Sequence, residues 1–150
     1  MAKMGKFSAS SLKKLQEKMN KLTQQDRDAF VAGCAKEIAA RLLGKVVKRT
    51  PVGVYPKSTG KHGGTLRRNW TVQEIRKEGS VYKVDVVNLA EDTVNHEYYA
   101  SYVEYGHRTA DHKGWVQGRF MLTISEQEVQ KLTPKLLEAR LEQYLRGIMG

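Results

Sequence analysis

The sequence predicts an α+β fold with two N-terminal helices, a small antiparallel β-sheet, and C-terminal helices packed on one face of that sheet. Three observations support this prediction. Apolar residues recur every three or four positions through most of residues 8–49, apolar and polar residues alternate over short stretches of 69–87, and the helical spacing returns after residue 120. A chain of 150 residues is expected to form a single domain.

The first helix is expected within residues 1–25. Its pattern extends over residues 8–22, where Leu12, Leu15 and Met19 recur at steps of three and four and therefore share one face. Serines at the start of this stretch can cap the helix, and lysines between the apolar positions face water.

The second helix is longer and is expected over residues 26–49, with Asp26 as its N-cap. Thr50 and Pro51 end it, because a residue that precedes proline is pushed toward extended geometry. One apolar stripe repeats at every fourth position, and its cysteine is expected to be a packing residue: Phe30, Cys34, Ile38, Leu42 and Val46.

Residues 50–69 are expected to form a long, mobile and basic loop. The stretch 52–65 contains four glycines and has no apolar periodicity. Cations on such a scaffold can neutralise phosphates or contact an acidic partner. The candidate partner- or DNA-facing residues are Lys57, Lys61, His62, Arg67 and Arg68.

Residues 70–105 are expected to hold the sheet. Apolar and polar residues alternate in the stretches 69–75 and 81–87, and glycine and serine at 79–80 signal a turn. The two stretches are expected to pair as an antiparallel hairpin over residues 77–80. The tyrosine-rich stretch 98–105 is too short for its periodicity to distinguish a strand from a helical turn.

Residues 106–118 are expected to form a second, mostly polar loop, and residues 119–150 a helical region. Two helices are expected there. One extends to about Lys131, and the last one has Thr133 as its N-cap and Pro134 in its first turn, where the missing N–H of proline costs nothing.

The charge is unevenly distributed along the chain. The first 80 residues carry a formal +12 and the remaining 70 carry −2. This asymmetry suggests a polyanionic partner or an assembly in which basic and acidic surfaces meet, and a solvated basic surface is the third interpretation. No stretch approaches the roughly 18 apolar residues of a membrane span, so no membrane partner is expected.

No residues form a convincing catalytic, cofactor or metal-binding pattern. The pair Gly60-Lys61 lacks the preceding glycine and following hydroxyl residue of a phosphate loop. His107, Asp111 and His112 lack the spacing of zinc ligands, and exposed loop histidines are the simpler interpretation. We therefore expect no enzymatic activity, no cofactor and no metal.

Two blocks of sequence resemble a known family. The first is RTPVG at 49–53 with TLRRNW at 65–70, and the second is YASYVEYGHRT at 99–109 with GRFML at 118–122. Their order resembles that of the tail-completion and neck proteins of tailed double-stranded-DNA bacteriophages, which include minor tail protein Z-like and tail-terminator-like components. The resemblance spans about residues 26–145. The chain departs from the family pattern in two segments that are longer than usual, the loop between residues 51 and 66 and the stretch 88–98.

The resemblance implies a structural virion protein, made in the host cytoplasm and without catalysis. Such a protein forms a ring, expected to be a hexamer, at the neck between the head connector and the tail tube, with DNA passing through the lumen. Its partners would be other copies of itself, the adjacent head-connector and tail-tube proteins, and DNA contacted without sequence specificity. A non-specific nucleic-acid-binding domain is the alternative.

The tyrosine-rich block would supply part of an assembly interface, because tyrosine is enriched at interfaces between proteins. Core packing of alternate tyrosines is the other interpretation of this block. The candidate interface residues are Tyr99, Tyr102, Glu104, Tyr105, His107 and Arg108.

Overall fold

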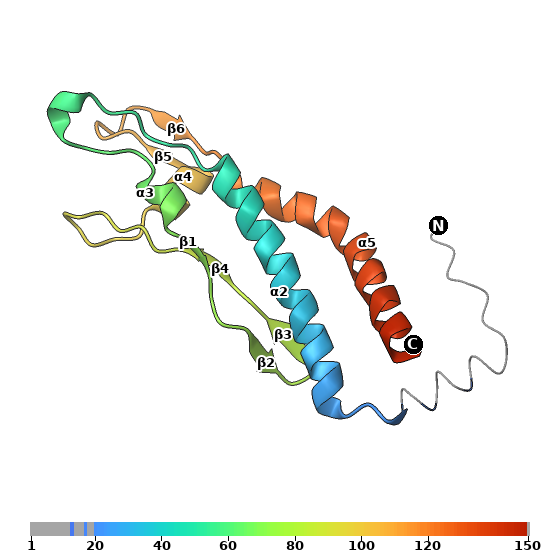
Figure 1. Cartoon of the computed structure of the whole chain (residues 1–150). Helices are drawn as coiled ribbons and strands as arrows, with labels where there is room; N and C mark the ends of the chain where they lie inside the picture. The colour runs from blue at the N-terminus through green and yellow to red at the C-terminus, as the bar shows by residue number, and fades with distance from the viewer. Residues whose placement is uncertain (1–12, 14–16, 18–19, 150) are drawn as a thin grey trace.

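The computed structural model describes residues 13, 17 and 20–149, and two long helices form its stem (Figure 1). Helix α2 (Gln24–Arg49) and helix α5 (Met121–Met149) lie side by side and run in opposite directions. Phe30 near the start of α2 stacks on Tyr144 near the end of α5, with ring centroids 4.4 Å apart. The helix expected over 8–22 lies almost entirely outside the described residues.

Helix α2 begins two residues earlier than predicted. Thr23 is its N-cap, and Asp26 is the third helical residue. The Thr23 hydroxyl accepts from the Asp26 N–H (3.1 Å) and the Asp26 carboxylate accepts from the Thr23 N–H (3.0 Å), which is a capping box. The hydrogen bonds that the Thr23 N–H and the Thr23 hydroxyl donate to the Asp26 carboxylate lower the pKa of Asp26. The predicted end of the helix at Arg49 is confirmed, since Thr50 is extended.

The predicted antiparallel hairpin is confirmed as a long two-stranded ribbon, but its turn is shorter than expected, because residues 77 and 78 are paired in a strand. Strand β1 (Trp70–Val72) pairs with β4 (Val86–Asn88), β2 (Arg76–Glu78) pairs with β3 (Val81–Lys83), and Gly79 begins the tight turn with φ 63°. The register shifts by one residue between the two pairs, because residues 74 and 75 lie opposite the single residue 84. This extra residue is a β-bulge, which increases the twist of the ribbon.

The ribbon packs on α2, and α5 lies on the other side of α2 (Figure 1). The prediction that C-terminal helices cover one face of the sheet is therefore not confirmed, since the main partner of α5 is α2. The buried core lies where α2, β1 and the start of α5 meet, and Val46 and Met121 have no exposed surface. The clustered core residues are Val46, Leu66, Trp70, Ala90 and Met121.

Three connecting segments have more regular structure than predicted. The expected loop 50–69 contains a short 3₁₀ helix η1 (Lys57–Thr59) and helix α3 (Thr65–Arg68). The stretch 98–105, for which a strand and a helical turn were both open, contains a helix, α4 (Ala100–Tyr105). The prediction of a loop over 106–118 is wrong, because β5 (Gly106–Arg108) and β6 (Trp115–Gln117) form an antiparallel hairpin. This hairpin lacks an apolar–polar alternation because β6 is exposed along its whole length, and the one buried residue of β5 is Gly106.

The C-terminal region is one helix of 29 residues, not two. Thr133 was expected to be an N-cap, but its hydroxyl donates to the carbonyl of Val129 (2.7 Å) one turn earlier. Pro134 lies inside α5, where its ring removes a backbone hydrogen bond, and α5 changes direction midway in Figure 1. Packing along α2 keeps both halves helical.

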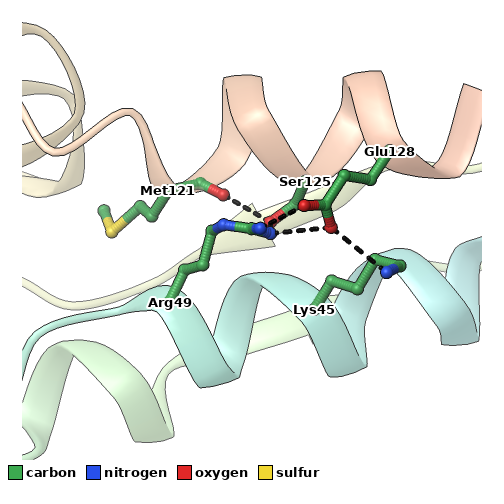
Figure 2. Close-up of polar contacts among 5 residues, drawn as sticks. All are labelled: Lys45, Arg49, Met121, Ser125 and Glu128. Atoms are coloured by element: carbon green, nitrogen blue, oxygen red, sulfur yellow. Dashed lines mark hydrogen bonds and ion pairs between the residues drawn. The ribbon is translucent and has the colours of Figure 1, made fainter.

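Ion pairs join the two helices of the stem. Figure 2 shows Glu128 of α5 between Lys45 and Arg49 of α2, with Lys45 Nζ 3.1 Å and Arg49 Nη1 3.0 Å from Glu128 Oε2. Arg49 also donates to the hydroxyl of Ser125 (3.3 Å), which in turn donates to the carbonyl of Met121 (2.6 Å). Hydrogen bonds from Arg49 and Lys45 lower the pKa of Glu128 to about 2.

Candidate functional site at the loop end

Two loops, a short helix and a hairpin lie at one end of the molecule, although the first loop is far from the others in the sequence (Figure 1). We call this region the loop end, and it comprises the loops 52–64 and 89–98, helix α4 and the β5–β6 hairpin. A groove lies between the two loops, and helix α4 and the residue before it contribute to its lining. Aromatic, basic and acidic side chains all line it, including Tyr55, Lys61, Glu91, Glu97, Tyr99 and Tyr102.

Thr50 fixes the point where α2 ends and the first loop begins. It is fully buried, its hydroxyl donates to the carbonyl of Val46 (2.6 Å), and the same oxygen accepts from Trp70 Nε1 (2.7 Å). The Thr50 carbonyl accepts from Arg67 Nε (3.1 Å) and Nη2 (2.7 Å). The cation of Arg67 therefore lies at the C-terminus of α2, where it is favourable for the helix dipole.

The five residues of the predicted basic surface divide into two groups. Arg67 binds the end of α2, and Arg68 donates to the carbonyl of Gly63 (3.1 Å). Lys57, Lys61 and His62 are exposed. The ammonium group of Lys61 lies 5.8 Å from the centre of the Tyr55 ring, a cation–π contact inside the loop. Arg68 is exposed as well, so of the five residues only Arg67 is partly buried.

Glu104 lies inside the molecule, and only 4% of its surface is exposed. Its carboxylate accepts from the N–H groups of Leu122 and Thr123, both at 2.8 Å, and from the Thr123 hydroxyl at 2.6 Å. A carboxylate at this position satisfies the free N–H groups at the start of α5 and favours its dipole. The candidate interface residue Glu104 therefore joins α4 to α5 within one subunit.

Four of the other candidate interface residues lie together: Tyr99, Tyr102, His107 and Arg108 line one shallow depression. The ring of Tyr102 is 51% exposed and meets His107 edge to face at 6.4 Å. Tyr105 is 62% exposed and contacts Phe120 instead. Burial raises the pKa of Tyr99, so of the three tyrosines this one belongs partly to the interior.

Among the exposed apolar residues of the loop end that the sequence did not single out are two on the hairpin. Trp115 is 60% exposed and Val116 is 43% exposed, and both lie on β6. The only signal was an apolar pair inside the polar stretch 113–118. The acidic residues Glu91 and Glu97 were also missed, because nothing in their spacing placed them beside the basic loop.

A comparison with protein-family models matches residues 13–106 to the HK97-gp10-like family, described as "Bacteriophage HK97-gp10, putative tail-component". The chain belongs to this family. Its similarity to phage tail-completion and neck proteins is thereby confirmed at the level of the family, and with it a structural role in a phage tail. Searches of curated proteins and of solved structures gave no match.

In this HK97-gp10-like protein, both blocks of family resemblance lie where secondary-structure elements meet. The first block contains Thr50, Arg67 and Trp70, which meet at the end of α2. The second block brings two glycines together at the base of the β5–β6 hairpin. Gly106 has φ 90°, and a Cβ on Gly118 would lie 2.5 Å from the carbonyl oxygen of Glu104, so neither position tolerates a side chain.

Two further properties bear on this family member. Across the part of the chain that the structure describes, no three His, Cys, Asp or Glu side chains are grouped so that they could hold a metal ion. Within the same residues, no helix has both the length and the apolar composition to cross a membrane.

Proposed function

We propose that this chain is a neck component of a tailed phage or phage-tail-like particle, where it acts in tail completion, tail termination or head–tail joining. It would form a ring, a hexamer in the assembled particle, between the head connector and the tail tube. The family supports the tail role, and the loop end supports assembly as the means by which the role is carried out.

The observation that carries this proposal is the exposure of large aromatic residues on a hydrogen-bonded scaffold. Tyr102, Tyr105 and Trp115 are all more than half exposed, and they lie within one region. Aromatic residues are enriched in protein interfaces, where they contribute much of the binding energy. A surface of this kind fits a protein that works in contact with its neighbours.

The partners we propose are other copies of this chain and the adjacent head-connector and tail-tube proteins. A closed ring needs one patch that fits a different patch on the next subunit. The exposed Lys57 and Lys61 would face an acidic patch on the adjoining ring in preference to DNA, because strongly attractive cations in the lumen would slow DNA passage. Arg67 is partly buried and donates to the Thr50 carbonyl, so one cation of this set is less available to DNA than the sequence suggests.

Cryo-electron microscopy of the particle tests the proposal. We expect density for this chain as a closed ring at the joint between head and tail. A particle that lacks the chain, or that contains it as an isolated monomer, would refute the neck role. Binding of the purified monomer to any DNA, with no ring in the particle, would favour the nucleic-acid-binding alternative.

A structural role also predicts the absence of nuclease activity. Purified full-length protein incubated with plasmid DNA and divalent metal ions should leave the plasmid intact. Cleavage that disappears in the variants His107→Ala or His112→Ala would contradict the proposal and locate a catalytic site in the hairpin.

A further inference from the structure

The β5–β6 hairpin is a projection that its own chain does not cover. All residues of β6 are exposed, including the large apolar side chains of Trp115 and Val116. The β1–β4 ribbon differs, since it packs on α2. A two-stranded hairpin in water is marginally stable by itself, so an uncovered one that carries tryptophan suggests a surface completed by another molecule.

The tip of this hairpin is nevertheless held in one shape. The Thr109 N–H donates to the carbonyl of Gly114 (3.0 Å), and the Gly114 N–H donates to the Thr109 hydroxyl (3.0 Å). The Asp111 carboxylate accepts from the Thr109 hydroxyl and from the Lys113 N–H (3.0 Å), which lowers the pKa of Asp111. A projection that is already ordered loses little conformational entropy when it binds.

The two faces of the hairpin point to different places. His107 lies opposite Val116, and Arg108 lies opposite Trp115, so these pairs occupy opposite faces. The His107 face meets Tyr102 of the subunit's own groove. The other face carries Trp115, whose cross-strand neighbour is Arg108, and Trp115 is not among the residues that line the groove.

The groove has the complementary chemistry. Tyr55, Tyr99 and Tyr102 provide aromatic surface. The loop 89–98 adds three carboxylates, those of Glu91, Asp92 and Glu97, which outnumber the one lysine of the lining, Lys61. Asp92 is engaged within its loop, where it accepts from the Val94 N–H (3.2 Å) and from Asn95 Nδ2 (2.8 Å). Glu91 and Glu97 remain exposed beside the tyrosines.

We propose that the β5–β6 hairpin of one subunit inserts into this groove on a second copy of the chain. Trp115 packs against the tyrosines, and Arg108 and Lys113 lie beside Glu91 and Glu97. Neither cation forms an ion pair among the described residues, so both are available to a neighbour. The contact joins two different patches, which is the type of interface that closes a ring.

This inference rests on the proposed ring and specifies how its subunits meet. The occupant is a second copy because both complementary patches lie on the same chain, and because Trp115 is exposed and does not line the groove of its own subunit. Aromatic and cationic groups on one side would meet aromatic and acidic groups on the other, which gives both buried area and directional charge contacts.

Site-specific photo-crosslinking in assembled particles tests the contact. The full-length chain carries p-benzoylphenylalanine in place of Trp115, and the control carries it in place of Gln143, an exposed residue of α5. We expect position 115 to give a product of twice the chain mass, with the linked peptide in 55–62 or 91–102, and position 143 to give no product at the groove. Linkage of position 115 to another surface or protein, or no linkage in particles that contain the ring, would overturn the inference.

A charge exchange gives an independent test. The double variant Arg108→Glu/Lys113→Glu should lower the yield of ring-containing particles by about tenfold or more, equivalent to about 1.4 kcal/mol. Glu91→Lys/Glu97→Lys should have a similar effect, and combining all four changes should restore the yield. If the variant with all four changes folds but the yield of ring-containing particles is not restored, the hairpin contact is overturned. The absence of any ring with the wild-type chain would instead refute the proposed function.

Discussion

The stem and the loop end contain similar side chains with different partners. In the stem, Lys45 and Arg49 of α2 bind Glu128 of α5, and Arg140 of α5 binds Glu37 of α2. At the loop end, Lys57, Lys61, Arg108 and Lys113 are exposed. The comparison teaches that a cation's partner, and not its position in a basic stretch, determines whether it stabilises the subunit or remains available for assembly.

The largest effect is expected at Glu104, which lies at the loop end but acts as part of the stem. Glu104→Ala should lower the free energy of unfolding by about 3 kcal/mol, because two backbone N–H groups and a hydroxyl at the start of α5 lose a charged acceptor. Urea denaturation measures the loss, with exposed Glu126→Ala as the control. A loss no larger than that of the control would show that the carboxylate does not hold α5.

The next effect is expected at Thr50, where the stem meets the first loop. Thr50→Val keeps the side-chain shape but removes the oxygen that accepts from Trp70 Nε1, which then lies buried without a partner. A loss of about 2 kcal/mol in the free energy of unfolding is expected. Thr93→Val, at an exposed position of the groove, is the matched control. Equal stabilities for the two variants would contradict this account of the joint.

A pH-dependent effect is expected from the ion pairs of the stem. The pKa of Glu128 falls from an ordinary value near 4.5 to about 2 in the folded state. Its contribution is therefore complete above pH 4.5 and is lost as the pH falls through about 2. The variant Glu128→Gln should be less stable than wild type at pH 7, and the difference should shrink as the pH approaches 2. A difference that is constant with pH would mean that charge is not the source of the stabilisation.

The smallest effect on stability is expected at the hairpin. Trp115 is 60% exposed, so Trp115→Ser should change the free energy of unfolding by no more than about 0.5 kcal/mol. Thermal unfolding of the free subunit measures this. A much larger loss would show that the hairpin, like the stem, stabilises the free subunit, which would contradict the distinction between the two regions.

The sequence predicted those elements that depend on local signals. The period of apolar residues identified α2, and a glycine–serine pair between alternating stretches located the turn at Gly79. The β5–β6 hairpin has no such period because β6 is exposed throughout and the one buried residue of β5 is a glycine. Pro134 suggested a break in α5 that packing against α2 overrides. Local propensity decides the first kind of element, and tertiary contacts decide the second.

The candidate site was predicted in part. The tyrosines of 98–105 and the exposed lysines of the first loop lie around one groove, although they are far apart in the sequence. The roles of Arg67 and Glu104 could not be predicted, because each depends on a helix end brought near by the fold. The net charge of the first 80 residues also overstated the positive charge available to a partner, because Lys45 and Arg49 pair with Glu128 of α5.

Amide hydrogen exchange in the free subunit and in the assembled particle tests most directly the claim that the loop end is the assembling region and the stem is not. We expect residues 52–64, 89–98 and 106–118 to exchange fast in the free subunit and to become protected on assembly, with little change in the middle of α2. The loop protection should weaken with added salt, because charged contacts are screened over about 8–10 Å at ordinary ionic strength. Fast exchange of all three segments in both states, or new protection confined to the stem, would contradict the account.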